Sequence, residues 1–398
     1  MLASLSLIFL VGLAMGAICQ KLKMPRIIGM LVTGIVLGPY VLDFLDPSIL
    51  SISSELRKLA LIIILLKAGL SLDLKDLKKA GRPAILMSFV PATCEIAGYI
   101  LFAPLLLGIN RIEAAVMGAV LGAVSPAVVI PRMVMLMEEK YGTKKAIPQM
   151  IMAGASCDDI FVIVLFTTFL SMAQGGSADI IDFVNIPVSI VLGILLGAVT
   201  GYGLYLFFET SYAHKHCVRN STKVIIVLGF SMLLVSVEGW LEGKVSVSGL
   251  LAVVSMACVI KIKSTAFVSK RLSEKFGKLW IAAEVVLFVL VGAAVDIRYT
   301  LSAGIAAVFM IFIALIFRTA GVLLCTIKTK LNMKERIFCV IAYLPKATVQ
   351  AAIGSVPLAA GLACGKIILS VAVLAIIITA PLGALGIDNT YKKLLEKE

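Results

Sequence analysis

Two adjacent aspartates, Asp158 and Asp159, lie inside a long apolar stretch that begins near residue 146. A helical rise of ~1.5 Å per residue places them about 20 Å into the stretch, near the middle of a bilayer. A charged carboxylate at that depth costs at least ~2.5–3.5 kcal/mol, so the pair requires partners or a water-filled cavity. Neighbouring helix positions point about 100° apart, which lets one carboxylate face a cavity and the other a helix. The pair indicates an ion-binding site; a structural ion pair is the alternative.

Two further charges of opposite sign, Glu95 and Arg318, also fall deep within apolar stretches. Arginine keeps its charge in proteins and therefore requires a counter-ion. Glu95 follows Asp73 at the same spacing at which Arg318 follows Asp296. We therefore expect Glu95 and Arg318 to form a buried ion pair, either as a structural link between helices or as a participant in the working cycle.

The elements that carry these residues are membrane spans. Hydrophobic residues make up 61% of the 398 positions and the mean hydropathy is +1.08, too apolar for a soluble chain. A spanning helix needs roughly 20 apolar residues, and shorter stretches serve inside a bundle. The sequence predicts an all-α membrane protein with thirteen spans, at about 2–20, 27–42, 58–72, 84–108, 112–137, 146–172, 183–208, 223–240, 245–262, 279–295, 302–327, 336–360 and 366–386.

Basic residues divide the loops between these spans into two groups. Most of the 36 Lys and Arg residues fall in alternate loops, from 21–26 through 261–278 to 391–398. Because short cytoplasmic loops collect Lys and Arg, the N-terminus is predicted outside and the C-terminus in the cytoplasm, in a prokaryotic plasma (inner) membrane. The loops also account for the net charge of +13, so no nucleic-acid partner is expected. The first span lacks a basic leader and is expected to stay as a helix.

A sequence pattern in the first half of the chain returns in the second. The pattern G-x-x-x-D-apolar-basic at 69–75 recurs at 292–298, at the opposite face, which predicts two inverted repeats. Proline removes a backbone donor, and broken helices at membrane depth occur only where they are buried or line a cavity. Interrupted helices at matching places of inverted halves predict a transporter site at the midplane. The two expected breaks contain Ser125 and Pro126, and Pro345, Lys346 and Thr348.

The repeats define the expected organisation of the chain. The first repeat spans 1–172 and the second 223–398, with a connector helix and loop at 173–222. Lys346 is expected either to compensate carbonyls freed at the break or to extend toward the membrane surface.

Three stretches resemble the monovalent cation:proton antiporter superfamily, most closely the branch containing the animal sodium/lithium–proton exchangers: 123–129, 155–160 and 344–352. The resemblance extends over nearly the whole chain. It implies antiport of Na⁺ or Li⁺ against protons by elevator-type alternating access, without a cofactor, in a homodimer surrounded by lipid. It also implies that the cation and protons compete at Asp159, with Asp158 beside it.

The same resemblance implies a core, ion-transport domain built from spans four to six and eleven to thirteen. Spans three and ten lie at its border, and the remaining spans form the scaffold of the dimer. Asp158 matches electrogenic members, whereas Arg318 replaces their lysine and its pairing with Glu95 resembles electroneutral members. The stoichiometry and the choice among Na⁺, Li⁺ and K⁺ therefore stay open.

Other protein classes fit these residues less well. An intramembrane aspartyl protease needs aspartates from separate helices, and a channel needs a filter, so neither an enzyme nor a channel is expected. A Na⁺-coupled symporter of an organic anion shares the inverted-repeat plan and is the main alternative. Four residues have open roles: Lys67, expected to extend to the surface, Glu284, expected at a wetted helix end, and His214 and His216, expected in a solvated loop.

Overall fold

A computed structural model describes residues 1–22, 24–71, 74–175, 180–213, 218–241 and 247–398. The regular structure of this part of the chain is helical, apart from an isolated bridge between Tyr141 and Lys397. The chain divides into two compact units. One comprises Met1–Ser54, Asp73–Gln174 and Val285–Glu398, and the other Glu55–Leu72 and Gly175–Glu284.

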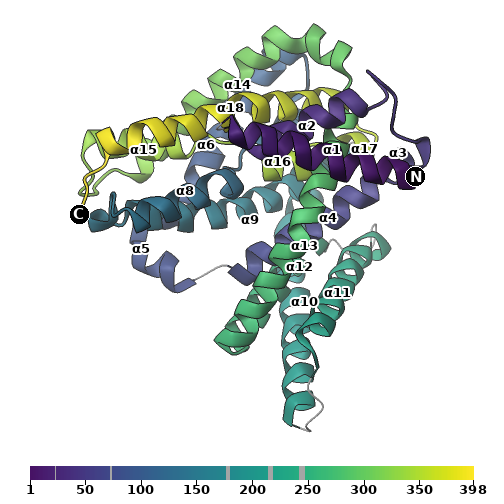
Figure 1. The fold of residues 1–398 in the computed structure, drawn as a ribbon, viewed down its shortest axis with the longest axis vertical. Coiled ribbons are helices and arrows are strands. Elements are labelled where there is room, and N and C mark those ends of the chain that lie inside the picture. The colour runs from purple at the N-terminus through teal and green to yellow at the C-terminus, as the bar shows by residue number, and fades with distance from the viewer. Residues whose placement is uncertain (23, 72–73, 176–179, 214–217, 242–246) are drawn as a thin grey trace. The chain divides into compact units, whose positions relative to one another are not determined.

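The first unit contains the charged residues that the sequence singled out, Glu95, Asp158, Asp159, Arg318 and Lys346. In this unit α6 packs against α7 and α14, and α14 packs against α18 (Figure 1). Its elements are α1 (Leu2–Lys21), α2 (Arg26–Leu37), α3 (Pro47–Ser51), α5 (Leu74–Met87), α6 (Val90–Leu107), α7 (Arg111–Leu121), α8 (Pro126–Glu138), the 3-10 turn η1 (Thr143–Lys145), α9 (Ile147–Gln174), α14 (Ile297–Cys325), α15 (Met333–Ala342), α16 (Thr348–Ile353), α17 (Val356–Ala359) and α18 (Gly365–Leu394).

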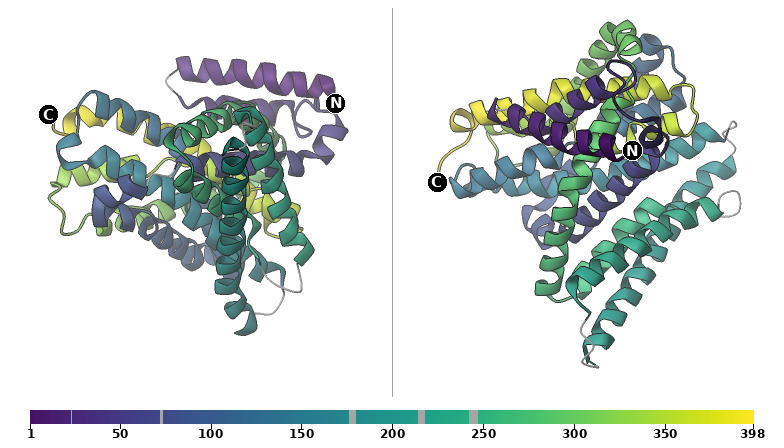
Figure 2. Two further views of the ribbon diagram at one scale, coloured as in Figure 1. Left: turned by 90° about the horizontal axis from the view of Figure 1, so that it is seen from below. Right: turned by 45° about the vertical axis from the view of Figure 1, so that its right-hand side comes forward.

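The second unit is a bundle of long helices. Nearly all of α4 (Ser53–Ser71) belongs to it, together with α10 (Ile180–Ala213), α11 (Asn220–Leu241), α12 (Gly249–Lys263) and the larger part of α13 (Ala266–Ala293). Figure 2 shows α10, α11 and α12 running alongside one another. Gly197 of α10 lies against the backbone of Ala252, where an added Cβ would collide with the carbonyl. The absence of a side chain thus allows α10 and α12 to approach closely, as small residues do in membrane bundles.

The helices agree in type with the predicted spans. Within the described residues, nine helical segments are long and apolar enough to cross a membrane, and Arg26–Leu37 and Thr348–Ala359 are shorter apolar segments. An all-helical membrane protein is therefore supported, while the count of thirteen spans and the inverted repeats stay predictions.

One predicted loop is helical. The basic segment 261–278 was expected to connect two spans, but α13 begins at Ala266 and runs through it. Its buried residues Leu272, Phe276 and Trp280 recur every four positions, which is the stripe of an amphipathic helix. The many charges conceal this stripe in the sequence.

Two spans are interrupted, as predicted. α7 ends at Leu121 before α8 begins at Pro126, and α15 ends at Ala342 before α16 begins at Thr348. α7 and α15 both start with a capping box, in which an asparagine and a glutamate three residues later cap each other's backbone N–H groups. The boxes begin at Asn110 and Asn332, so α7 and α15 start with the same N-terminal capping motif. Sequence reasoning missed this likeness, which supports the predicted repeat.

Candidate ion-binding site

The two helix breaks meet in the first unit. The Ser125 backbone N–H donates a hydrogen bond to the Pro345 carbonyl at 2.8 Å, so the start of α8 is joined to the break before α16. Pro126 is the first residue of α8, a position where the missing N–H of proline is tolerated. The buried hydroxyls of Ser125 and Thr348 have no hydrogen-bond partner among the described residues. The structure thus brings together the five residues that the sequence assigned to the breaks.

Side chains from other elements satisfy the carbonyls at the first break. The end of a helix leaves carbonyls without an intrahelical partner and carries partial negative charge, so it attracts cations. Donors from α14, the second break and α16 fill these places: Arg318 donates to Gly122, Lys346 to Leu121, and Gln350 to Ala123 at 2.8 Å.

Glu95 of α6 lies between two cations. Its Oε2 is 2.7 Å from Nη1 of Arg318, and its Oε1 is 2.7 Å from Nζ of Lys346. All three side chains are at most 1% exposed. The predicted partners Glu95 and Arg318 are in contact, and Lys346 joins them as a third member. Its buried ammonium compensates a carbonyl of the break and does not extend toward the membrane surface.

The two adjacent aspartates have different surroundings. Oδ2 of Asp158 accepts hydrogen bonds from the Val124 N–H at 2.7 Å and from Nη2 of Arg318 at 3.3 Å. Asp159 is 6% exposed and has no ion-pair partner among the described residues, and its buried Oδ1 lacks a hydrogen bond there. Because successive helix positions point in different directions, Asp158 faces the first break and Asp159 does not share its hydrogen bonds.

A close approach of the chain holds α9 beside the second break. Gly154 lies one turn before Asp158, and a Cβ at this position would collide with the Tyr343 hydroxyl. A larger side chain at position 154 would therefore require the Tyr343 side chain to shift.

The buried cluster is unbalanced in charge. Glu95, Asp158 and Asp159 contribute three carboxylates, whereas Arg318 and Lys346 contribute two cations. Glu95 and Asp158 each contact a cation, which leaves Asp159 as the extra carboxylate. An uncompensated charge in a protein interior is costly, so the cluster is neutral when Asp159 holds one proton or one monovalent cation.

Three residues of the cluster were missed in the sequence. The Tyr343 carbonyl accepts from Nε of Arg318 at 2.6 Å, and the Thr379 hydroxyl accepts from the Lys346 N–H at 3.0 Å. Gln350 also accepts from the Ala347 N–H at 2.8 Å, three residues before it. This is only half of a capping box, because Ala347 has no side-chain acceptor, so the spacing gives no signal in the sequence. Nothing in the sequence singles out Thr379.

The residues with open roles lie elsewhere. Glu284 is 1% exposed, so the prediction of a wetted helix end is wrong; α13 continues beyond it to Ala293. Lys67 is half-buried on α4. Asp73, His214 and His216 lie outside the described residues.

Broken helices that meet around buried charges define the class of the protein as a membrane transporter. The structure is similar to that of the sodium proton antiporter MjNhaP1 from Methanocaldococcus jannaschii, with a TM-score of 0.83 over 99% of this chain and 98% of that chain. The sequences are 21% identical, so this likeness concerns the fold.

Residues 5–392 match the family model described as sodium/hydrogen exchanger, transmembrane, and the chain belongs to this family. It is 35% identical over 388 residues to sodium/hydrogen exchanger 9B2 of Homo sapiens, covering 94% of this chain and 70% of that protein. It is 31% identical over 418 residues to sodium/hydrogen exchanger 9B1 of Homo sapiens, covering 100% of this chain and 78% of that protein. The predicted family is confirmed, and its members are transporters and not enzymes.

The predicted location in a prokaryotic plasma (inner) membrane is wrong. The similar exchangers named above, and 9B2 of Pongo abelii at 35% identity, are animal proteins. Alternating basic loops distinguish the two faces of a membrane but do not identify the kind of cell or membrane. Family membership supports a membrane protein.

Proposed function

We propose that this protein exchanges Na⁺ or Li⁺ for protons, and that the cation and the proton compete for Asp159. One observation carries the proposal: among the described residues, the buried cluster has one more carboxylate than it has cations, and Asp159 is the carboxylate without an ion-pair partner there. Carboxylate oxygen is a suitable ligand for a hard cation and for a proton. A site that holds one or the other, but not both, couples their movements. Transported ions are then the substrates, and no cofactor is needed.

Asp158 has a second role in this proposal. Its contacts to Val124 and Arg318 orient α9 against the first break and leave Oδ1 without a hydrogen bond among the described residues. Oδ1 is therefore the Asp158 atom that can assist Asp159 in binding the cation.

The movement is proposed to be of the elevator type, with a core built from α6–α9 and α14–α18 in a homodimer. The contacts of Arg318 support a core that moves as one body. From α14 this side chain reaches Glu95 of α6, Gly122 after α7, Asp158 of α9 and Tyr343 after α15. Two inverted repeats, 1–172 and 223–398, and a scaffold formed by the other spans complete this proposal.

Proton release tests the site. Purified protein in weakly buffered detergent solution should release protons when NaCl or LiCl is added, and Asp159→Asn should abolish the release while the protein remains folded. Asp43→Asn, which changes an exposed carboxylate, is the matched control and should behave like wild type. Equal release from wild type and Asp159→Asn would show that the site is elsewhere. Na⁺ binding without proton release would favour the symporter.

Asp158 decides whether exchange moves net charge. If it carries a second proton, a Na⁺ jump on a solid-supported membrane should give a current that Asp158→Asn removes. We expect Asp158→Asn to retain weakened, electroneutral exchange, because asparagine keeps an oxygen for the Val124 N–H and Arg318 also contacts Glu95. Complete loss of exchange by a folded variant would show that both carboxylates are required.

A further inference from the structure

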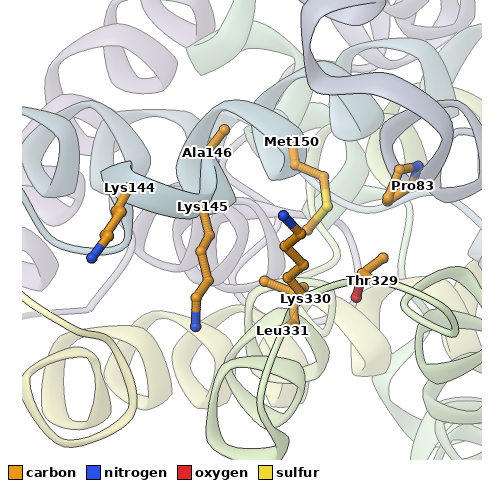
Figure 3. A pocket seen from close by; sticks show the side chains of 8 residues that line it. All are labelled: Pro83, Lys144, Lys145, Ala146, Met150, Thr329, Lys330 and Leu331. Carbon is orange, nitrogen blue, oxygen red and sulfur yellow. The ribbon is translucent and has the colours of Figure 1, made fainter.

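A second polar site lies at the opening turn of α9, away from the aspartates. A pocket of about 210 Å³ is lined by three lysines, Lys144, Lys145 and Lys330, and by apolar residues that include Pro83, Met150 and Leu331 (Figure 3). All of them belong to the first unit. Twelve helical residues separate Ala146 from Asp158, or about 18 Å, so the pocket is distinct from the ion-binding site.

The pocket has uncompensated positive charge. Lys145 is paired with the buried Glu335, whose two oxygens lie 2.8 and 2.9 Å from Nζ, and Oε1 of Glu396 lies 4.0 Å from the same atom. The hydrogen bond to Glu335 raises the pKa of Lys145, which keeps the ammonium charged. Lys144 and Lys330 have no carboxylate at ion-pair distance among the described residues. Figure 3 shows the Lys330 ammonium directed toward the first turn of α9 and Lys144 at the rim, pointing away.

The surroundings indicate the chemistry of a ligand. Lysine binds phosphate as a point charge, and basic pockets between membrane helices bind lipid headgroups. This pocket lies at the ends of three candidate spans, Gly81–Leu107, Ile147–Gln174 and Gly304–Cys325. Met150 and Leu331 make part of its wall apolar. We propose that the pocket binds a phosphate-bearing anion, supplied by an anionic phospholipid headgroup or by soluble phosphate.

The ligand would join segments that lead to the ion-binding site. Lys144 lies in η1, between the broken helix α8 and the aspartate-bearing α9, and Lys330 lies between α14, which carries Arg318, and α15. An anion held by Lys330 at the first turn of α9 therefore lies beside both connectors of the first unit, and Lys144 at the rim adds to the positive charge that attracts it. Its binding does not depend on the proposed exchange, and the two are tested separately.

Binding is measured by the thermal stability of the full chain in detergent, titrated with dioleoyl phosphatidic acid or with inorganic phosphate. Phosphatidylcholine and chloride at equal ionic strength are the references. The double variant Lys144→Gln/Lys330→Gln should weaken the apparent affinity about fivefold for each lysine, or about 25-fold. The matched control, Lys334→Gln/Lys366→Gln, removes the same charge from exposed positions outside the pocket and should bind like wild type.

The outcomes separate the sources of the anion. Stabilisation by phosphatidic acid alone supports a lipid headgroup, and equal stabilisation by inorganic phosphate supports a soluble anion. If the pocket variant and the control lose affinity equally, or if wild type responds no more to either probe than to the references, the proposal is overturned. The single variants Lys330→Gln and Lys330→Arg extend the test should the double variant fold poorly. The first should lose affinity about fivefold, and the second should keep it because its charge is unchanged.

Discussion

The two helix breaks occupy corresponding places in the proposed repeats but satisfy their backbone groups differently. At the first break, three carbonyls accept from long side chains of other elements, and two of these side chains, Arg318 and Lys346, are charged. At the second, the Pro345 carbonyl, the Lys346 N–H and the Ala347 N–H have neutral partners, and only the Tyr343 carbonyl meets a charge.

The charged donors at the first break come from the second half of the chain. Lys346 belongs to the second break yet serves the first, whereas Pro126 stands near the corresponding place of the first break and offers no donor in return. The two breaks therefore differ in the charge of the side chains that satisfy their backbone groups. Losing a charged contact at the first break should cost more stability than losing a neutral one at the second, and substitutions can test this order.

The largest loss is expected from Arg318→Ala, which removes donors from both breaks and leaves Asp158 without its cation. Breaking a buried ion pair by removing one partner costs about 3–5 kcal/mol. We expect a fall of this size in the free energy of unfolding, measured by denaturation in detergent. Arg336→Ala is the control, because this half-buried arginine donates to the Leu331 carbonyl and to neither break; its loss should be about 1 kcal/mol.

A double-mutant cycle tests the same pair. Glu95→Ala should also be strongly destabilising, since it leaves two cations, Arg318 and Lys346, without their shared carboxylate. The double variant Glu95→Ala/Arg318→Ala should recover part of the combined loss. Strictly additive losses would show that the pair is not coupled in solution.

A smaller effect is expected from Lys346→Met, which keeps the length of the side chain and removes its charge. Glu95 retains Arg318, but the Leu121 carbonyl loses its charged donor and keeps only the longer hydrogen bond from Gln350 at 3.4 Å, so we expect a loss of about 2–3 kcal/mol. Lys334→Met changes an exposed lysine and should stay within about 0.5 kcal/mol of wild type in the same unfolding measurement. Equal stability of the two variants would mean that the first break does not depend on Lys346.

Much of this arrangement follows from the sequence because buried charge is rare and costly in a membrane. Glu95, Arg318, Asp158 and Asp159 interrupt apolar stretches, and prolines mark both breaks, so the cluster and the broken helices could be predicted. Glu95 follows Asp73 at the spacing at which Arg318 follows Asp296, and this match predicts that Glu95 and Arg318 pair. The sequence leaves the role of Lys346 open, because a lysine beside a break can compensate carbonyls or extend outward, and only the fold distinguishes these two roles.

The remaining features depend on tertiary contacts or on patterns with weak signals. Thr379 is an ordinary threonine in an apolar helix, and only the packing of α18 against the break gives it a role. Surrounding charge conceals the stripe of Leu272, Phe276 and Trp280, so the sequence predicts a loop where the structure has a helix. The burial of Glu284 could not be predicted, because an apolar stretch does not show which part of its helix other helices pack against.

Gln350 touches both breaks with a neutral side chain. In Gln350→Met the Ala123 carbonyl loses its donor and the Ala347 N–H loses its acceptor, which should cost about 2 kcal/mol in the unfolding measurement. Gln149→Met is the control, since the Gln149 Oε1 has no hydrogen-bond partner among the described residues. A loss as large as that of Arg318→Ala would contradict the proposed ranking of charged over neutral contacts.

The smallest effect is expected from Thr379→Val, which alters the second break alone. Valine keeps the shape of the side chain and leaves the Lys346 N–H without an acceptor, so a loss of about 1 kcal/mol is expected. Thr390→Val on the same helix is the control. The Thr379 and Thr390 hydroxyls both donate to a carbonyl four residues earlier in α18, Ala375 and Gly386 respectively, but the Thr390 hydroxyl touches neither break. The difference between the two variants therefore isolates the contact to the break. If Thr379→Val destabilises the protein as much as Lys346→Met, the second break depends on its neutral partners as strongly as the first depends on its cations.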